Sequence, residues 1–163
     1  MKMVDSFEKI PLEIFPGAKE GSAFVAREIA SLIRKKQKAG ESCVLGLSTG
    51  SSPLDLYARL VSMHREEGLS FRNVIAFNLD EYYPIDPGTP QSYHYFMRKN
   101  LFDLVDIDPA NCHIPNGQLP KEAMKKHCAE YEKAIETAGG IDLQILGIGT
   151  NGHSGFNEPG SGL

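Results

Sequence analysis

The sequence predicts an α/β fold of the Rossmann-like kind, with a doubly wound, mostly parallel sheet and helices on both faces. Short apolar runs at 43–47, 74–79 and 141–148 have the length of buried strands, and segments with helical periodicity alternate with them. Connections of this kind keep the strands parallel and place helices on both sides of the sheet. The 163 residues suit one domain, 1–163.

The amino-terminal part supplies the first three elements. Alternating apolar residues at 12–15 predict a short edge strand, which a Pro-Gly pair at 16–17 closes. A helix is expected over 18–38, because its apolar residues recur at helical spacing and basic residues precede Gly40. The run 43–47 is then the first buried strand.

A second strand, loop and helix follow. The helix should reach about residue 65, with Ser52 as its N-cap, Pro53 in its first turn and Asp55 at the capping-box position. The strand at 74–79 comes next and ends on Asp80-Glu81.

Turn signals and periodicity predict the remaining elements. They are a turn-rich passage at 84–90, a helix at 92–102, a loop at 103–111, a small strand at 112–114, a helix at 123–138 and the last strand at 141–148. No internal repeat interrupts this order, so a single domain remains the expectation.

Composition excludes several classes of function. A net charge of −4 gives no basic footprint, so no nucleic-acid partner is expected. No stretch approaches the ~18 apolar residues of a membrane span, and the amino terminus has no signal-peptide core. The three cysteines form no CxxC pair or disulfide framework, which is typical of a reducing compartment. We therefore expect a cytoplasmic protein without a membrane partner.

Three unusual loops each follow a predicted strand, at 48–52, 80–83 and 149–158. In doubly wound sheets, the loops at the carboxyl ends of the strands gather in one crevice. The sequence therefore predicts that these loops share one pocket.

The first loop contains Thr49, Gly50, Ser51 and Ser52. Hydroxyls, a flexible backbone and the free N–H groups of a helix start together suit an anion such as phosphate. No lysine follows, so this is not a Walker A loop. Taken alone, the segment also fits an ordinary capped turn between a strand and a helix.

In the second loop, Asp80 and Glu81 are neighbours and should point to opposite sides of an extended chain, so at most one enters the crevice. A carboxylate at a strand end can act as a base on a carbon-bound proton if burial raises its pKa. The alternative is a solvated turn.

The third loop contains GIGTNG at 147–152, which matches GxGxxG. A dinucleotide site needs a helix to begin there, whereas glycines and a proline follow, so we exclude it. Asn151 and Glu158 flank His153, and such neighbours can hold one imidazole tautomer for proton transfer near neutral pH. No residue set has the usual zinc spacing, so no metal is expected.

Together, the motifs resemble the glucosamine-6-phosphate deaminase (glucosamine-6-phosphate isomerase) family. The resembling strings are LGLSTGSSP at 45–53, FNLDEYY at 77–83, PQSYHYFM at 90–97 and LGIGTNGHSGFNEPGS at 146–161. The resemblance implies an enzyme of amino sugar metabolism, without an organic cofactor, that converts glucosamine 6-phosphate and water to fructose 6-phosphate and ammonia. Its small-molecule partner would be a sugar phosphate. Because family members are often homo-oligomers, the resemblance also suggests a homo-oligomer.

The resemblance also implies residue roles. His153 would open the sugar ring, and Asp80 would move a proton from C2 to C1. Glu158 and Asn151 would orient and tune His153, and residues Thr49–Ser52 would contact the substrate phosphate. Many members carry aspartate in place of Asn151, so His153 should become charged less readily here.

Members of the resembling family continue well beyond this point and supply basic side chains for the substrate phosphate. The resemblance therefore predicts that these 163 residues are the amino-terminal part of a longer protein, incomplete at the carboxyl end of the fold and inactive alone. Two other functions remain open. One is 6-phosphogluconolactonase, a relative whose strand end typically reads Asp-Glu-Arg, and the other is a non-catalytic sugar-phosphate sensing module.

Overall fold

The computed structural model of the protein describes residues 11–161 and contains a four-stranded parallel sheet in the order β3-β2-β1-β4. β1 pairs with β2 in register from Cys43 opposite Val74 to Leu47 opposite Asn78. The four strands are β1 (Cys43–Leu47), β2 (Val74–Asn78), β3 (Cys112–His113) and β4 (Leu143–Gln144). The strand order reverses direction at β1, as the predicted doubly wound topology requires.

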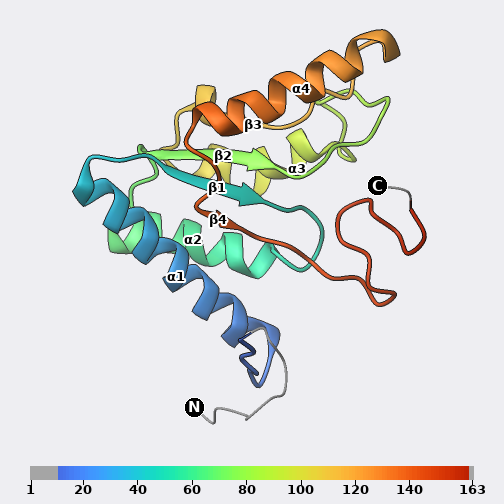
Figure 1. Cartoon of the computed structure of the whole chain (residues 1–163). Coiled ribbons are helices and arrows are strands. Elements are labelled where there is room, and N and C mark those ends of the chain that lie inside the picture. The colour runs from blue at the N-terminus through green and yellow to red at the C-terminus, as the bar shows by residue number, and fades with distance from the viewer. Residues whose placement is uncertain (1–10, 162–163) are drawn as a thin grey trace.

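Helices cover both faces of the sheet (Figure 1). α1 (Ala18–Ala39) and α2 (Leu54–Glu67) pack against each other below it, and α4 (Lys121–Thr137) lies above it. α3 (Tyr93–Asn100) contacts α2, and the single-turn helices η1 (Phe102–Leu104) and η2 (Pro109–Asn111) follow. The predicted fold class is therefore confirmed.

The core lies mainly between the sheet and the α1–α2 layer. All five residues of β1 are buried, and α1 contributes a buried stripe at helical spacing. From α2, Tyr57 and Leu60 are fully buried against this stripe. Two helices on this side explain why the most completely buried side chains gather here.

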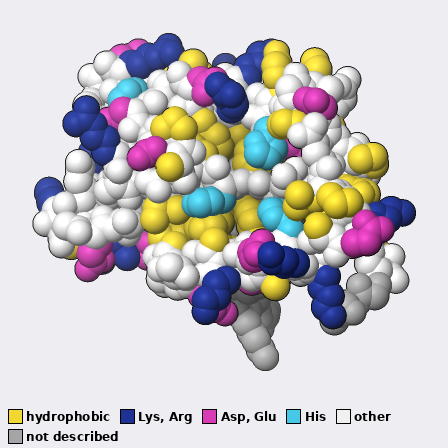
Figure 2. Space-filling view, turned by 90° about the horizontal axis from the view of Figure 1, so that it is seen from above, with side chains coloured by type: hydrophobic (Ala, Val, Ile, Leu, Met, Phe, Trp, Pro, Cys, Tyr) yellow, Lys and Arg dark blue, Asp and Glu magenta, His cyan; other side chains and the backbone are white. Residues whose placement is uncertain are grey.

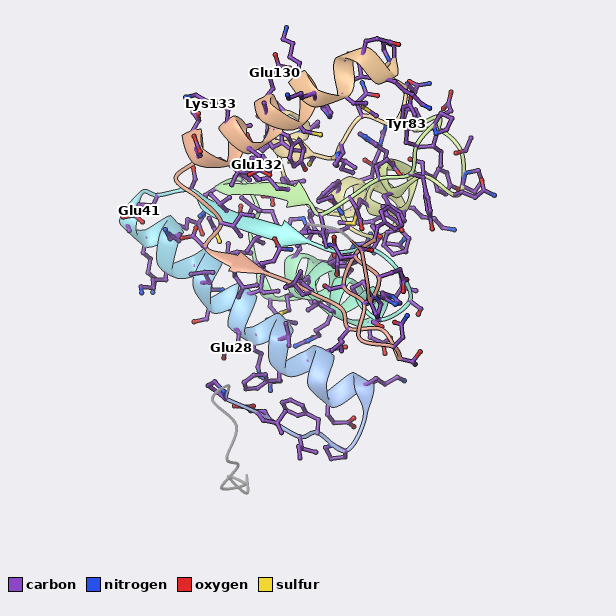
Figure 3. All side chains as sticks on the ribbon, turned by 45° about the vertical axis from the view of Figure 1, so that its right-hand side comes forward. Glu28, Glu41, Tyr83, Glu130, Glu132 and Lys133 are labelled. Atoms are coloured by element: carbon purple, nitrogen blue, oxygen red, sulfur yellow. The ribbon has the colours of Figure 1, made fainter. Side chains whose placement is uncertain are left out.

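On the opposite face of the sheet, α4 contributes no buried residue, so this face is packed less completely than the face under α1 and α2. Seen from this side, hydrophobic side chains and histidines are visible at the centre, within a charged rim (Figure 2). Glu130 and Lys133 of α4 point away from the sheet (Figure 3). Within residues 11–161, no helix is long and apolar enough to cross a membrane.

The edge strand expected at 12–15 is wrong. Those residues form no strand, and Leu12 and Ile14 are 60% and 74% exposed. Phe15 packs instead on Phe24 of α1, with ring centroids 5.2 Å apart. Phe15 is thus apolar because it packs on a helix. The spacing of apolar residues at 12–15 does not distinguish such a contact from the alternation of a strand.

The expected cap of the second helix is also wrong. Pro53 is the N-cap of α2, and no side chain caps the helix, while Ser52 remains exposed in the preceding turn. Gly50 has a φ of 103°, and the N–H of Leu54 lies 3.4 Å from the carbonyl oxygen of Ser51. Ser52 and Pro53 therefore belong to this turn, and the helix begins only at Leu54.

The last strand is shorter than 141–148. β4 pairs with β1 only at Leu143 and Gln144, although the N–H groups of Asp142 and Ile145 extend the bonding to β1 by one residue on each side. Beyond them, Leu146 and Ile148 are 60% and 84% exposed. The apolar run is thus paired over only part of its length.

Candidate active site

The three predicted loops line one cleft of about 590 Å³ at the carboxyl ends of the strands, which confirms that they share a pocket. Thr49–Ser52 come from the first loop, Asp80 from the second, and Gly149 and His153 from the third. Figure 1 shows the third loop, in red, curling at the end toward which the arrows of β1 and β2 point. Asn151 and Glu158 are not among the lining residues, but both lie close to the Nδ1 of His153.

The loop at 48–53 connects β1 to the start of α2. The Tyr57 hydroxyl donates to the Ser48 carbonyl at 2.5 Å, so the first turn of α2 holds the base of the loop. Burial raises the pKa of Tyr57 far above its ordinary value, which keeps this donor protonated. Thr49, Ser51 and Ser52 line the cleft directly before α2 begins, and hydroxyls beside a helix start suit a phosphate group.

Asp80 leaves β2 two residues after the last paired position and lines the cleft. Burial, and then the neighbouring charge of Glu81, raise the pKa of its carboxyl above the ordinary value. Among residues 11–161, no hydrogen bond holds the Asp80 carboxylate, so it is available as a base.

Glu81 turns the other way, as the alternation of an extended chain predicts. Its carboxylate accepts hydrogen bonds at the start of α3, from the Ser92 hydroxyl at 2.8 Å and from the Tyr93 N–H at 3.0 Å. The expectation that only one of the two acids enters the crevice is confirmed.

His153, Asn151 and Glu158 form a connected group. The His153 Nδ1 lies 2.6 Å from the Asn151 Oδ1 and 3.5 Å from the Glu158 Oε1. The Asn151 Nδ2 donates to the Glu158 Oε2 at 2.6 Å, and the His153 N–H donates to the Asn151 Oδ1 at 3.1 Å. The amide of Asn151 therefore lies between the imidazole and the carboxylate.

This arrangement selects one histidine tautomer. Because the Asn151 NH₂ group must donate to Glu158, its oxygen must face the imidazole, and an amide oxygen only accepts. The proton of neutral His153 therefore sits on Nδ1. Its Nε2 is left as the basic nitrogen, which is the form needed to accept a proton from a bound molecule.

Two glycines bring the histidine loop to its place. A side chain at Gly149 would overlap the His153 ring. Gly155 has a φ of +59°, and a Cβ there would lie 2.9 Å from Leu79 and 3.2 Å from the Asp80 carboxylate. The loop backbone thus approaches both candidate proton carriers too closely for other residues.

The same loop is not a dinucleotide site. In the described part of the chain, the residues after β4 form turns and a single bridge between Ser154 and Asn157, and no helix begins there. Residues 11–161 also contain no group of three or more His, Cys, Asp or Glu side chains arranged to hold a metal ion.

Sequence reasoning assigned no role to Tyr93 or to the start of α1. Tyr93 lines the cleft together with Asp80, and Ser22 of α1 also lines the cleft. Tyr93 lies within the motif PQSYHYFM at 90–97, which could have indicated that it belongs to the site. Its position depends on how α3 begins, which local sequence does not specify. Among the described cleft-lining residues there is no lysine or arginine.

Residues 16–155 match the family described as glucosamine-6-phosphate isomerases/6-phosphogluconolactonase. A putative glucosamine-6-phosphate deaminase-like protein of Bacteroides thetaiotaomicron is 49% identical over 156 residues, which are 96% of this chain and 24% of that protein. The glucosamine-6-phosphate deaminase of Thermoanaerobacter sp. is 51% identical over 135 residues, or 83% of this chain and 53% of that protein. The chain thus spans about half the length of such deaminases, or less.

Solved structures have the same architecture. A monomeric glucosamine-6-phosphate deaminase is 40% identical with a TM-score of 0.82, over 90% of this chain and 58% of that one. A 6-phosphogluconolactonase from Thermotoga maritima is 26% identical with a TM-score of 0.68, over 83% of this chain and 59% of that one.

Proposed function

The chain belongs to the family of glucosamine-6-phosphate isomerases and 6-phosphogluconolactonases, and we propose that the protein containing it is a glucosamine-6-phosphate deaminase. It would convert glucosamine 6-phosphate and water to fructose 6-phosphate and ammonia. The observation that carries the proposal is the shared cleft, in which Asp80 and His153 lie with the hydroxyl-rich loop at 49–52.

His153 would open the sugar ring. With Nδ1 held by Asn151, the free Nε2 can take the proton of the C1 hydroxyl and return it to the ring oxygen. Glu158, 3.5 Å from Nδ1, stabilises the imidazolium formed between these two transfers. The product is the open-chain aldehyde.

Asp80 would carry out the isomerisation. Its ionised carboxylate removes the proton from C2 while the C1 oxygen takes a proton from water, which gives an enolamine between C1 and C2. The protonated carboxyl then returns its proton to C1, the nitrogen gives a proton back to water, and C2 becomes an imine. Water adds to C2, ammonia leaves, and the C2 ketone of fructose 6-phosphate remains. The raised pKa of Asp80 favours this role, because its carboxylate is a stronger base than an ordinary aspartate.

The loop at 49–52 would bind the substrate phosphate through backbone N–H groups and hydroxyls. The described cleft lining includes no cationic side chain, and such neutral donors bind a phosphate more weakly than lysine or arginine does. We therefore propose that the whole protein supplies basic groups from outside these 163 residues, and that the 163 residues alone release no ammonia.

Deaminase is favoured over lactonase by the relatives. The solved deaminase is 40% identical to this chain, against 26% for the lactonase of Thermotoga maritima. A sensing module that binds the sugar phosphate without reaction would not need the free Asp80 carboxylate or the oriented imidazole.

The test is ammonia release from glucosamine 6-phosphate by the whole protein as its gene encodes it. Turnover is expected in the wild type and loss of turnover in Asp80→Asn, with binding of fructose 6-phosphate retained. Hydrolysis of 6-phosphogluconolactone without ammonia release would assign the lactonase instead. Binding without either reaction would assign the sensing module.

Location and assembly complete the proposal. We place the protein in the cytoplasm, because Cys43, Cys112 and Cys128 are all free thiols, as is typical of a reducing compartment. Cell fractionation tests this. The expectation of a homo-oligomer is also carried forward, and sedimentation of the whole protein tests it.

A further inference from the structure

The Glu81 carboxylate gathers donors from two separate segments. Its Oε1 accepts from the N–H of Tyr82 at 2.9 Å and from the N–H of Tyr93 at 3.0 Å. Its Oε2 accepts from the Ser92 hydroxyl at 2.8 Å and from the N–H of His94 at 3.2 Å. One side chain therefore closes the loop 82–92 onto the first turn of α3.

The position suits a charge. The first N–H groups of a helix have no partner within the helix, and the helix dipole favours an anion there. Ser92, the N-cap, is completely buried, and its hydroxyl also accepts from the His94 N–H at 3.0 Å. Replacing Glu81 with a side chain that offers fewer acceptors would leave donors in this turn unsatisfied.

Tyr93 connects this turn to the cleft. It is the first residue of α3, so its backbone is fixed directly by Glu81, while its side chain lines the cleft next to Asp80. Burial raises the pKa of Tyr93 far above its ordinary value, so the hydroxyl stays protonated at neutral pH. The direction of this side chain depends on how α3 begins.

An aromatic cluster then joins Tyr93 to the histidine loop. The ring centroids of Tyr82 and Tyr93 are 5.0 Å apart, and those of Tyr82 and Phe156 are 5.1 Å apart. The rings of Tyr93 and Phe156 are stacked, with centroids 6.1 Å apart and an interplanar angle of 14°. Such pairs stabilise beyond their buried area.

Phe156 is the one large apolar side chain in the glycine-rich stretch 149–160, and it lies between His153 and Glu158 in the chain. Phe156 is half-exposed, and it connects the loop that carries the imidazole to two tyrosine rings. Both of its aromatic partners, Tyr82 and Tyr93, are residues whose N–H groups are bound by Glu81. The position of the histidine loop thus depends on the carboxylate through two contacts.

We propose that Glu81 is a positioning residue that sets the geometry between Asp80 and His153, by fixing the start of α3 and, through Tyr82, Tyr93 and Phe156, the histidine loop. Its part in catalysis rests on the proposed function, but its control of the loop does not. Glu81 itself touches no reacting atom in this arrangement. The competing view is that Glu81 only caps a helix and affects stability.

The test compares Glu81→Gln with Asp106→Asn in the whole protein. Both substitutions remove a carboxylate that accepts from one hydroxyl and from the backbone. Glu81 accepts from three backbone N–H groups and Asp106 from one, and Asp106 lies outside the cleft. Hydrogen exchange is followed in peptides covering 149–160, where the N–H groups of Gly149, Gly152 and Asn157 are hydrogen-bonded. Ammonia release is measured in parallel to give kcat and KM.

Glu81→Gln should speed exchange in 149–160 by about 10-fold, and Asp106→Asn should leave it unchanged. In the same variant kcat should fall by about 10- to 100-fold with KM changed little, because misplacement of reacting groups affects the chemical step. Equal exchange in the two variants overturns the proposal. So does a Glu81→Gln protein with normal kcat.

Two controls keep the result decisive. If Glu81→Gln does not fold, Ser92→Ala removes one of the four donors and should show the same pattern with smaller amplitude. If the wild type itself releases no ammonia, the proposed function fails, and the exchange comparison still decides whether Glu81 controls the histidine loop.

Discussion

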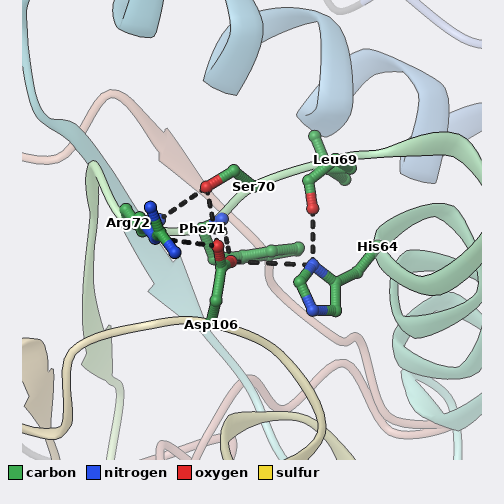
Figure 4. A network of polar contacts seen from close by, with 6 residues as sticks. All are labelled: His64, Leu69, Ser70, Phe71, Arg72 and Asp106. Atoms are coloured by element: carbon green, nitrogen blue, oxygen red, sulfur yellow. Dashed lines mark hydrogen bonds and ion pairs between the residues drawn. The ribbon is translucent and has the colours of Figure 1, made fainter.

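The two ends of the strands use aspartate in opposite ways. At the amino end of β2, the Asp106 carboxylate accepts from the Phe71 N–H at 2.6 Å and from the Ser70 hydroxyl at 2.8 Å (Figure 4). Burial raises the pKa of Asp106, but these bonds and the nearby His64 outweigh burial and hold the pKa below its ordinary value. At the carboxyl end of the same strand, burial and Glu81 raise the pKa of Asp80.

A second carboxylate follows the amino-end pattern. Asp142 accepts from the Val44 N–H at 2.9 Å and lies 2.7 Å from the Lys36 ammonium. Burial raises its pKa, but the hydrogen bonds from Lys36 and from the Val44 N–H, together with the Lys36 charge, lower it below the ordinary value. The amino end therefore satisfies its carboxylates and gains stability from them, whereas the carboxyl end leaves Asp80 unsatisfied and available for chemistry.

The largest expected effect tests the carboxyl end. In the whole protein, Asp80→Asn should lower kcat by about 10²- to 10⁴-fold, because it removes the proposed base. The unfolding temperature should stay the same or rise, since a half-buried charge without a hydrogen bond is removed. Steady-state ammonia release and thermal unfolding measure the two quantities. A marked loss of stability would place Asp80 with the amino-end carboxylates.

Asp106→Asn should show the reverse pattern. We expect the free energy of unfolding to fall by about 1–3 kcal/mol, because two hydrogen bonds to a charged group are weakened, while kcat is unchanged. The folded-state pKa is depressed, so the stabilisation is present above the unfolded value of about 3.9 and is lost as pH falls through the folded value. Urea unfolding at neutral and acidic pH measures it, and a difference that persisted at low pH would contradict the assignment.

Gly155→Ala should displace the backbone of the histidine loop at the carboxyl end of the strands. The positive φ costs about 1–2 kcal/mol for any other residue, and the new methyl group would press on Leu79 and Asp80. Activity should therefore fall while the amino-end contacts persist. Gly147→Ala is the matched control, because it has no positive φ and open space around its Cβ. Equal activity in both variants would show that the close approach is not needed.

The smallest effect concerns the tuning of His153. Asn151→Asp should move the pH optimum of ammonia release upward, because a second carboxylate beside Nδ1 favours the imidazolium. Asn157→Asp changes the same residue type in the same loop, where Asn157 bonds the Ser154 carbonyl and not His153. A pH profile that moved equally in both variants would point to general loop charge.

Much of the fold was predictable because its signals are local. The buried strands at 43–47 and 74–79 and the long helices were confirmed within a few residues, since apolar runs and glycine stops act over short distances. The strand at 12–15 and the Ser52 cap were wrong for a different reason. The first was decided by a contact with α1, Phe15 on Phe24, and the second by the turn through Gly50, which sequence patterns did not indicate.

The sequence by itself determined the fold class and the meeting of three loops in one cleft, because parallel strands bring their carboxyl ends to a common edge. It also indicated Thr49–Ser52, Asp80 and His153 as cleft residues, and their catalytic and binding roles remain predictions. Only the tertiary structure decided that Glu81 turns to α3, that Asn151 lies between His153 and Glu158, and that Phe156 stacks on Tyr93. These depend on turn geometry and on packing between segments far apart in the chain, which no local pattern encodes.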